Sequence, residues 1–430
     1  MDREIALEIL LKYKQEQSYL NLSLNASFMH YDLSKEKKDF ITRLVYGTVQ
    51  NQLYLEYMLE PFIKTRVKSF EKMLLLMSLY QHYFLDSIPD YAIVNEAVKI
   101  AKKKKGVKTA QFINAVLNHA LTSERSLTDL NELERLSVET SHPLWLVKML
   151  SKQYGSEITK KICIADNESP YKTARINTLK TSMKDILTNP LFEKGKLSED
   201  CVYYHGGNIA HSDEFKEGKV TIQDESSQCV ARLLHPLPGD NVLDMCCAPG
   251  SKTTHMAALM ENKGNIQAYD LYEHKIPLVE EQAKRLGIDI IHAKAYDSTK
   301  LTDLYPAESF DKILLDGPCS GLGVLARKPE IKYHDSSVMD EIIKIQEKLL
   351  ENAYALLKNG GNMVYSTCTI NKKENEKQIQ AFIKKHPQMH IIKEITILPY
   401  EYHSDGFYMC LLEKEIFNEI NIRLYSRTIN

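Results

Sequence analysis

The stretch that decides the fold is residues 242–254, VLDMCCAPGSKTT. Its first residues are apolar as in a buried strand, its last residues suit the start of a helix, and a short loop with Pro249 and Gly250 lies between them. Such a loop lets backbone N–H groups approach a ligand at the helix N-terminus. It is neither GxGxxG nor a P-loop, so no dinucleotide or triphosphate is implied. Taken alone, the segment is equally compatible with an ordinary strand-to-helix turn.

The same strand–loop–helix alternation continues through residues 236–430. Helices are predicted to begin at Lys252, Glu273, Met339 and Glu374. The predicted strands are 241–245, 265–271, 289–293, 312–316, 362–366, 389–397 and 407–413. This pattern predicts a Rossmann-like α/β domain with a mostly parallel seven-stranded sheet covered on both faces. In that class, ligands lie at the carboxyl ends of the strands.

The first part of the chain has a different pattern. From Glu4 to Leu121 apolar residues recur at steps of three and four, which predicts a bundle of six or seven short helices within residues 1–140. Residues 141–235 combine a helix near 146–154 with short strands near 172–177 and 220–223, which indicates a small α/β module. A chain of 430 residues is long enough for this three-domain organisation.

Composition narrows the classes of function. With 43% hydrophobic and 26% charged residues the chain is globular, and its net charge of −2 gives no overall attraction for a polyanion, so a nucleic-acid site must rest on local clusters. No apolar run has the length of a membrane span and the first residues do not read as a secretory signal, so we expect a cytoplasmic protein without a membrane partner. The eight cysteines lack zinc-type spacing, and no metal is expected.

Three aspartates are predicted at the carboxyl edge of the sheet. Asp270 ends the second strand, 20 residues after Gly250, while Asp297 follows the third and Asp316 closes the fourth. A carboxylate in the position of Asp270 accepts hydrogen bonds from ribose hydroxyls in α/β nucleotide sites. Three such acceptors beside a glycine-containing loop suit a nucleoside ligand without phosphates, and S-adenosylmethionine fits that description.

Two cysteines are predicted to emerge at the same edge. Cys319 follows the fourth strand and Cys368 ends the fifth, 49 residues later. A nucleophilic thiolate there needs electropositive help, which Lys252 or a helix N-terminus can give. Buried, inert roles are expected for Cys163, Cys201, Cys229 and Cys410.

Methylation of cytosine at carbon 5 explains a pair of thiols beside a methyl donor. Addition of a thiolate to C6 makes C5 nucleophilic, and a hydrogen bond at N3, which Asp316 is placed to supply, favours the addition. The product stays attached until the C5 proton leaves, and Cys319 can assist that elimination. Simple N- or O-methylation would require neither cysteine.

Several motifs extend over residues 220–413: QDESSQ at 223–228, DMCCAPGSKT at 244–253, DGPCSG at 316–321, RKPEIK at 327–332 and STCT at 366–369. On these motifs, residues 220–413 resemble the RNA cytosine-5 methyltransferases of the NOL1/NOP2/Sun type. On DYAIVNEAV at 90–98 and FINAVL at 112–117, residues 1–140 resemble the RNA-binding protein NusB. Such a fusion is similar to bacterial enzymes that methylate small-subunit (16S) ribosomal RNA.

The resemblance implies roles for individual residues. Cys368 is the implied nucleophile, Cys319 aids release of the product, and Asp316 completes the catalytic set. The implied S-adenosylmethionine site consists of Cys246, Cys247, Ala248, Pro249, Gly250, Ser251, Lys252, Asp270, Asp297 and Asp316. The sequence departs from the usual motif at two positions, with Cys247 in place of alanine and Ser251 in place of a second glycine.

Basic clusters are the candidate RNA contacts. Six lysines fall within residues 99–108, and a solvated helix end and phosphate contact are equally good interpretations of them. They are Lys99, Lys102, Lys103, Lys104, Lys105 and Lys108. A weaker cluster comprises Lys64, Arg66, Lys68 and Lys72. Contacts to the target strand are expected from Arg327, Lys328 and Lys332.

The preferred hypothesis is a monomeric enzyme that methylates cytosine in 16S ribosomal RNA. Transfer RNA as substrate is one alternative. A second is an inactive NusB-like RNA-binding or assembly protein, against which the intact Cys368, Cys319 and Asp316 argue.

Overall fold

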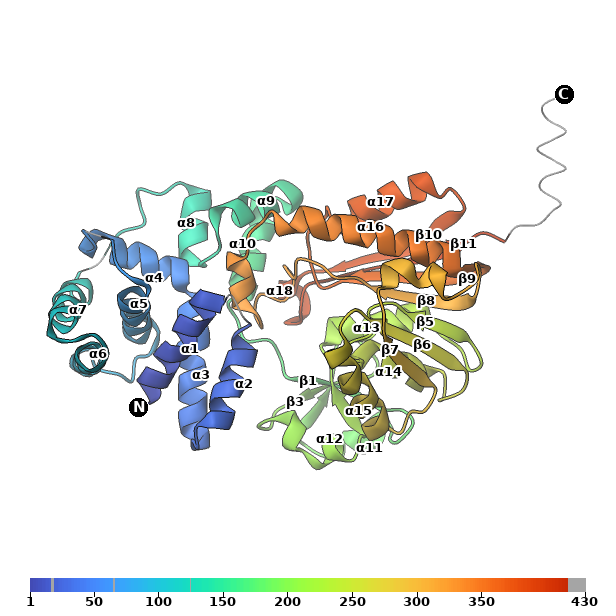
Figure 1. Ribbon diagram of the computed structural model, residues 1–430, viewed down its shortest axis with the longest axis horizontal. Helices are drawn as coiled ribbons and strands as arrows, with labels where there is room; N and C mark the ends of the chain where they lie inside the picture. Colours follow the sequence, from blue (N-terminus) through green and yellow to red (C-terminus); the bar gives the residue numbers. More distant parts are fainter. Residues whose placement is uncertain (17–18, 65, 124, 417–430) are drawn as a thin grey trace, which may run out of the picture. The chain divides into compact units, whose positions relative to one another are not determined.

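The computed structural model describes residues 1–16, 19–64, 66–123 and 125–416, which form two compact units (Figure 1). The helical unit consists of residues 1–168 and a later segment, 325–334. The sheet unit consists of residues 169–324 and, among the described residues that follow, 335–416. A stretch that lies between two strands of the sheet unit in sequence therefore folds with the helices.

Seven helices precede residue 121 in the helical unit, in agreement with the predicted bundle. They are α1 (Asp2–Glu16), α2 (Leu20–His30), α3 (Lys35–Gln50), α4 (Gln52–Leu59), α5 (Ser69–Phe84), α6 (Asp90–Lys105) and α7 (Val107–Ala120). Helix α5 is buried on all sides from Met73 to Gln81, which makes it the core helix around which α1, α3, α4, α6 and α7 pack. Helix α6 begins directly after Pro89, which cannot continue a helix on its N-terminal side.

The described residues of the helical unit also form three further helices and two short 3-10 turns. They are α8 (Glu132–Glu139), α9 (Leu144–Tyr154), α10 (Ser156–Ala165), η1 (Glu60–Phe62) and η5 (Pro329–Tyr333). The turn η5 packs on α3, and the Tyr333 hydroxyl donates a hydrogen bond to the Val49 carbonyl at 2.9 Å. Among the described helices, none is long and apolar enough to cross a lipid bilayer.

The sheet unit opens with a small antiparallel sheet of order β2-β3-β1-β4. Its strands are β1 (Thr173–Ile176), β2 (Phe192–Lys194), β3 (Cys201–Tyr204) and β4 (Val220–Ile222). Short helices α11 (Met183–Ile186) and α12 (Asp213–Lys216) accompany them. The strands predicted near 172–177 and 220–223 correspond to β1 and β4, whereas the helix predicted near 146–154, which is α9, belongs to the helical unit.

A seven-stranded sheet of order β10-β11-β9-β8-β5-β6-β7 forms the rest of the unit. The strands are β5 (Asn241–Asp244), β6 (Asn265–Asp270), β7 (Ile291–Ala295), β8 (Phe310–Asp316), β9 (Leu357–Thr367), β10 (Met389–Ile397) and β11 (Phe407–Lys414). Strands β5 to β9 pair in parallel, whereas β11 runs antiparallel to both its neighbours. The predicted fold class is therefore confirmed.

Helices cover both faces of this sheet (Figure 1). On one face, Leu243 and Ile313 pack against α16 (Val338–Leu356) and α17 (Glu376–Lys385). On the other face, Val242, Leu314 and Val364 pack against α13 (Glu225–Leu234), α14 (Ser251–Leu259) and α15 (Ile276–Leu286). Side chains alternate along a strand, so adjacent residues point to opposite faces of the sheet. Because helices bury both faces, each strand needs a continuous run of apolar residues.

Candidate active site

Two loops leave the carboxyl edge of the sheet from adjacent strands. Strand β8 pairs in parallel with β9, and the register places Asp316 opposite Ser366. The loop that holds Cys319 starts directly after β8, and the loop that holds Cys368 starts directly after β9. Because both strands end at the same level, the two loops lie side by side. A backbone hydrogen bond of 3.0 Å from Gly323 N–H to the Cys368 carbonyl joins them further.

The two predicted thiols meet. The sulfur atoms of Cys319 and Cys368 are 3.3 Å apart, and both side chains are partly exposed. The contact with Cys368, burial and the charge of Cys368 hold the pKa of Cys319 well above its ordinary value. A protonated Cys319 can therefore donate its S–H to Cys368 across this contact.

An ion pair lies beside the thiols. The Lys252 ammonium contacts one carboxylate oxygen of Asp316 at 2.7 Å, and the Ser366 hydroxyl donates to the other at 2.7 Å. Burial lowers the pKa of Lys252, but the Asp316 carboxylate, with Cys368 in the same direction, raises it to a net value above the ordinary one. Lys252 therefore stays cationic, a charge that would favour a thiolate at Cys368.

A cavity of about 340 Å³ opens at the same edge of the sheet. Its lining includes Cys246, Ala248, Asp270, Asp297 and Asp316, which are five of the ten residues predicted for the cofactor site. The remaining lining residues are Met245, Leu271, Tyr272, Lys275, Ser298, Thr299, Gly317, Pro318, Ile345 and Leu349. The cavity thus combines an apolar lining with three carboxylates, a set of acceptors that matches the hydroxyls and cationic groups of S-adenosylmethionine.

Other residues of the predicted cofactor loop shape the cavity without lining it. Cys247 is buried against Ala268 and Val279, so its side chain belongs to the core. Gly250 has φ +101°, and a side chain there would crowd Val279, which explains why this position requires glycine. Ser251 opens α14 as an ordinary helical residue, so the departure from a second glycine costs no backbone strain.

Asp244, at the end of β5, holds the predicted cofactor loop in place through hydrogen bonds. Its buried carboxylate accepts hydrogen bonds from the Thr253 hydroxyl at 2.7 Å and from Cys246 N–H at 3.3 Å. Burial raises the pKa of Asp244 to about 7. In the sequence, Asp244 stands out only as part of the motif at 244–253, although an aspartate that ends a predicted buried strand itself indicates a site at the edge of the sheet.

The small α/β module contributes Arg175, which the sequence analysis did not single out. This fully buried guanidinium donates hydrogen bonds to Gln223, to the Ser251 carbonyl and to the Thr254 hydroxyl. Ser251 and Thr254 lie in the first turn of α14. Arg175 therefore holds the start of this helix, which follows the cofactor loop, against the small α/β module. An arginine in a short strand gives no local signal for this role.

The expectation that Lys332 contacts the target strand is wrong. Its side chain is fully buried in the helical unit, where the ammonium contacts Asn167 Oδ1 at 3.0 Å and the Gln50 carbonyl at 3.5 Å. Burial lowers the pKa of Lys332 to about 8, partly opposed by Asp166. The reason is that residues 325–334 fold with the helices. In the same segment, the Lys328 ammonium lies 5.2 Å from the Tyr19 ring centre.

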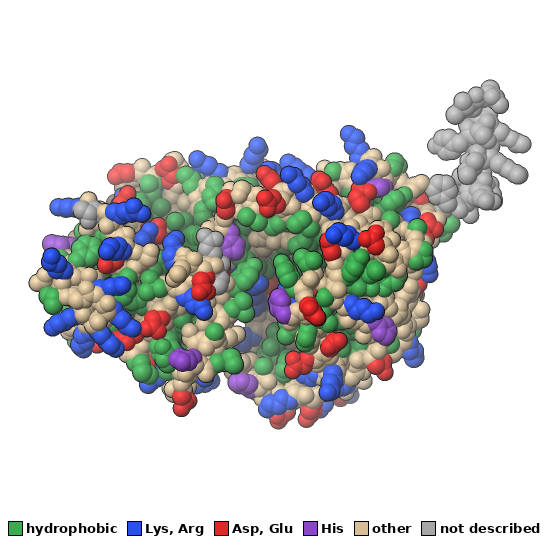
Figure 2. All heavy atoms as spheres, viewed as in Figure 1, with side chains coloured by type: hydrophobic (Ala, Val, Ile, Leu, Met, Phe, Trp, Pro, Cys, Tyr) green, Lys and Arg blue, Asp and Glu red, His purple; other side chains and the backbone are tan. Residues whose placement is uncertain are grey.

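The lysine run divides into two groups. Figure 2 shows lysine and arginine side chains gathered over the α6 and α7 end of the helical unit, with acidic side chains among them. The paired group consists of Lys99, Lys103 and Lys104, which form ion pairs with Glu96, Glu4 and Glu8, respectively. The open group consists of Lys102, Lys105 and Lys108, which are exposed and have no ion pair among the described residues.

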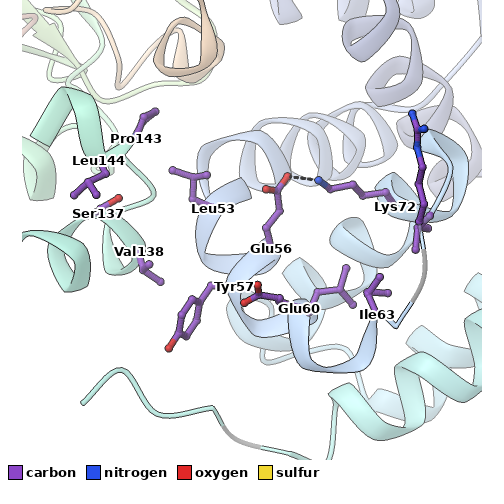
Figure 3. A pocket seen from close by; sticks show the side chains of 13 residues that line it. Leu53, Glu56, Tyr57, Glu60, Ile63, Lys72, Ser137, Val138, Pro143 and Leu144 are labelled. Carbon is purple, nitrogen blue, oxygen red and sulfur yellow. Dashed lines mark ion pairs between the residues drawn. The ribbon is translucent and has the colours of Figure 1, made fainter. Parts of the chain in front are cut away.

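A larger cavity, of about 720 Å³, lies within the helical unit (Figure 3). Leu53 and Tyr57 of α4 face Val138 of α8 across it, and an ion pair of 2.9 Å joins Glu56 to Lys72. No cysteine lines it, and none of the predicted catalytic residues does. The chemistry of the lining, rather than volume, therefore selects the smaller cavity as the candidate active site.

Comparisons with known proteins agree with both units. The family described as "16S rRNA methyltransferase RsmB/F" matches residues 231–413, the NusB family matches 1–122, and the "Methyltr_RsmF/B-like, ferredoxin-like domain" matches 142–201. Among solved structures, PH0851 has a TM-score of 0.82 at 24% identity and covers 96% of this chain and 99% of its own. NSun6 from Pyrococcus horikoshii with SFG has a TM-score of 0.59 at 23% identity and covers 63% of this chain and 98% of its own. At these identities both show the fold alone.

Curated relatives extend the match to nearly the whole chain. The "Probable ribosomal RNA small subunit methyltransferase B" of Bacillus subtilis is 41% identical and covers 96% of this chain and 98% of its own. The protein of the same description from Synechocystis is 31% identical and covers 96% of this chain and 99% of its own. This chain therefore belongs to the RsmB/F family of 16S rRNA methyltransferases that carry an N-terminal NusB domain.

Proposed function

We propose that this protein methylates carbon 5 of a cytosine in 16S ribosomal RNA through a transient covalent bond between Cys368 and C6 of the base. The observation that carries the proposal is the 3.3 Å contact between Cys319 and Cys368, whose loops leave the same edge of the sheet as Asp316, a residue that lines the cavity. Family membership supports the ribosomal RNA substrate.

In the first step, the Cys368 thiolate adds to C6 while N3 of the base takes up a proton and donates a hydrogen bond to the Asp316 carboxylate, which favours the addition. Lys252, which pairs with Asp316 at 2.7 Å, stabilises the thiolate before the attack and holds Asp316 in place. Electron density moves to C5, which forms a bond to the methyl group as the bond between that methyl group and the donor sulfur breaks.

In the second step, the C5 proton leaves and the bond between C6 and Cys368 breaks. Cys319 takes that proton. Before addition, contact with Cys368 and its charge help to hold the pKa of Cys319 high. Once Cys368 is bonded to carbon it carries no charge, so these two causes disappear; Cys319 then gives its own proton to solvent water, and the resulting thiolate acts as the base. The broken bond returns its electron pair to Cys368 as a thiolate.

S-adenosylmethionine is the methyl donor that fits the cavity, and when bound it supplies an electrophilic methyl group. Membership of the methyltransferase family supports this assignment, as does the fold shared with NSun6 bound to an S-adenosylmethionine analogue. In this proposal Asp270 accepts from the ribose hydroxyls, while Asp297 and Cys246 contact the rest of the cofactor. The five loop residues outside the lining, Cys247, Pro249, Gly250, Ser251 and Lys252, fix the shape of the site.

The domain boundaries 1–140, 141–235 and 236–430 remain a proposal, with RNA binding assigned to the first two domains and methyl transfer to the third. We further propose that the enzyme works as a cytoplasmic monomer. The target base must leave any stack to reach Cys368, which costs a few kcal/mol in a duplex and less in a loop, so an accessible cytosine is the expected target.

Bisulfite sequencing of ribosomal RNA from cells with and without the protein tests the proposal. One 16S cytosine should be protected from conversion only when the protein is present. Transfer of tritium from labelled S-adenosylmethionine to purified 16S RNA, and not to transfer RNA, would separate this function from that of a transfer RNA methyltransferase. Absence of transfer to either RNA would favour an inactive RNA-binding protein instead.

A further inference from the structure

Glu374 is a buried carboxylate that lies between the two cysteine loops. It is fully buried and belongs to the turn that connects the Cys368 loop to α17. Within reach of its oxygens lie neutral donors from both loops and from α16. A buried charge is tolerated only when hydrogen bonds satisfy it, so these donors and the carboxylate hold one another in place.

Glu374 is bonded directly to the residue after Cys319. The Ser320 backbone N–H donates to Glu374 Oε2 at 2.8 Å, and the Ser320 hydroxyl donates to Oε1 at 2.6 Å. The Gln346 amide of α16 approaches Oε2 at 3.4 Å and also donates to the Pro318 carbonyl at 2.8 Å. The Cys319 loop is thus fixed to the carboxylate on both sides of the cysteine.

The same carboxylate also holds the Cys368 loop. The Asn371 amide donates to Glu374 Oε1 at 2.9 Å, and the hydroxyls of Ser320 and Thr369 are 2.8 Å apart. Because the Ser320 hydrogen is directed to Glu374, Thr369 donates in that second contact. Thr369 directly follows Cys368, so a chain of short hydrogen bonds runs from one cysteine loop through Glu374 to the other.

We propose that Glu374 is a positioning residue that holds Cys319 against Cys368, so that the second thiol reaches the C5 proton when the product is released. This inference rests on the proposed function. A displacement of about 1 Å in a reacting group costs roughly 100-fold in rate. Loss of the carboxylate frees the Cys319 loop, whereas Cys368 still directly follows the last residue of strand β9. The release step should therefore suffer more than the addition step.

The test compares Glu374→Gln with the wild type and with Cys319→Ala. Glutamine has nearly the same shape but offers one oxygen in place of two, and its NH₂ group faces a donor of Ser320 or Asn371. With 16S RNA and labelled S-adenosylmethionine, Glu374→Gln should form the covalent RNA adduct within about threefold of the wild-type rate and resolve it about 10- to 100-fold more slowly. Adduct should accumulate on denaturing gels, as for Cys319→Ala.

Glu376→Gln is the matched control, because it makes the same change two residues away, at the first residue of α17. It should resolve the adduct at the wild-type rate. If Glu374→Gln does not fold, Ser320→Ala removes the hydroxyl link without altering a buried charge and should slow release about tenfold. The melting temperature of each variant shows whether it is folded.

Two results would overturn the inference: a folded Glu374→Gln variant that releases product at the wild-type rate, or one in which addition and release fall by the same factor. These results differ from a failure of the proposed function. If the wild type itself formed no adduct, the covalent mechanism would be wrong. If the wild type formed adduct and Glu374→Gln behaved identically, only the role of Glu374 would be wrong.

Discussion

Replacing Asp270 with alanine is expected to weaken binding of S-adenosylmethionine by about 10- to 150-fold. Asp270 is the last residue of β6 and lines the 340 Å³ cavity. One of its carboxylate oxygens accepts from Tyr272 N–H at 3.0 Å and lies 3.5 Å from the Lys275 ammonium, which fixes the orientation of the group. A hydrogen bond to a charged acceptor contributes about 1.5–3 kcal/mol, and about 1.4 kcal/mol corresponds to a factor of ten.

Isothermal titration calorimetry of the apo-protein with S-adenosylmethionine measures this change. Asp270→Asn keeps an oxygen acceptor but loses the charge, so its affinity should fall between those of the wild type and Asp270→Ala. Asp289→Ala is the control, because this exposed residue precedes β7, outside the cavity lining, and its removal changes the net charge equally.

An unchanged dissociation constant in a folded Asp270→Ala variant would refute the assignment of Asp270 to the cofactor. An equal loss of affinity in Asp289→Ala would mean that net charge, rather than a contact with the ribose, controls binding. Thermal unfolding of all three variants checks that the sheet unit is intact.

Two further predictions concern the lysine run and the effect of pH. Changing the open group to glutamine should weaken RNA binding and lower the slope of log K against log salt by about 2–3 units, whereas changing the paired group, whose charges are already neutralised, should have a smaller effect. Filter binding across a salt series measures both slopes. Equal slopes for the two triple variants would contradict the division of the lysine run into an open group and a paired group. Burial and nearby Arg175 lower the pKa of His255 to about 4, against 6.5 when unfolded. Between these two pKa values the unfolded state binds a proton at His255 and the folded state does not. The free energy of unfolding therefore falls as the pH drops from about 6.5 to about 4, by about 2 kcal/mol between pH 7 and pH 5. Urea unfolding should show this loss, and His255→Gln should reduce it; the same loss in that variant would assign it to other groups.

Site residues could be predicted from the sequence where they lie at the carboxyl ends of parallel strands. Asp270, Asp316, Cys319 and Cys368 each follow or end a strand, and parallel strands deliver their carboxyl ends to one edge. The two cysteines are far apart in sequence, yet strand order alone makes them neighbours once β8 and β9 pair. The distance of 3.3 Å between their sulfurs, however, depends on loop contacts that strand order does not determine.

Glu374 illustrates what local sequence conceals. It lies in the stretch NKKENEK at 371–377, which has the composition of an exposed helix start. Its burial follows from donors contributed by Ser320 and Gln346, which are distant in sequence. The burial of Lys332 is also hidden in the local sequence, because it depends on residues that are distant in sequence. A basic residue near a catalytic motif suggests an RNA contact, but the segment 325–334 folds among helices that the sequence places more than 150 residues earlier.

The lysine run shows the same limitation on a surface. The pairing of Lys103 with Glu4 and of Lys104 with Glu8 joins α6 to α1 across more than 90 residues. Sequence spacing identifies a cluster of charge but not the acids that the tertiary fold brings to it. The boundaries of β9 differ from the prediction because Lys358 to Gly361 carry no strand-like alternation, although the strand already pairs with β8 at Leu357.

The most direct test of the covalent mechanism is a denaturing gel of protein mixed with 16S RNA and labelled S-adenosylmethionine. The wild type should show a faint, transient adduct, and Cys319→Ala should accumulate it because the C5 proton is no longer removed efficiently. Cys368→Ala should form no adduct and transfer no methyl group. An adduct that persists in Cys368→Ala, or methyl transfer by that variant at the wild-type rate, would contradict the assignment of Cys368 as the nucleophile.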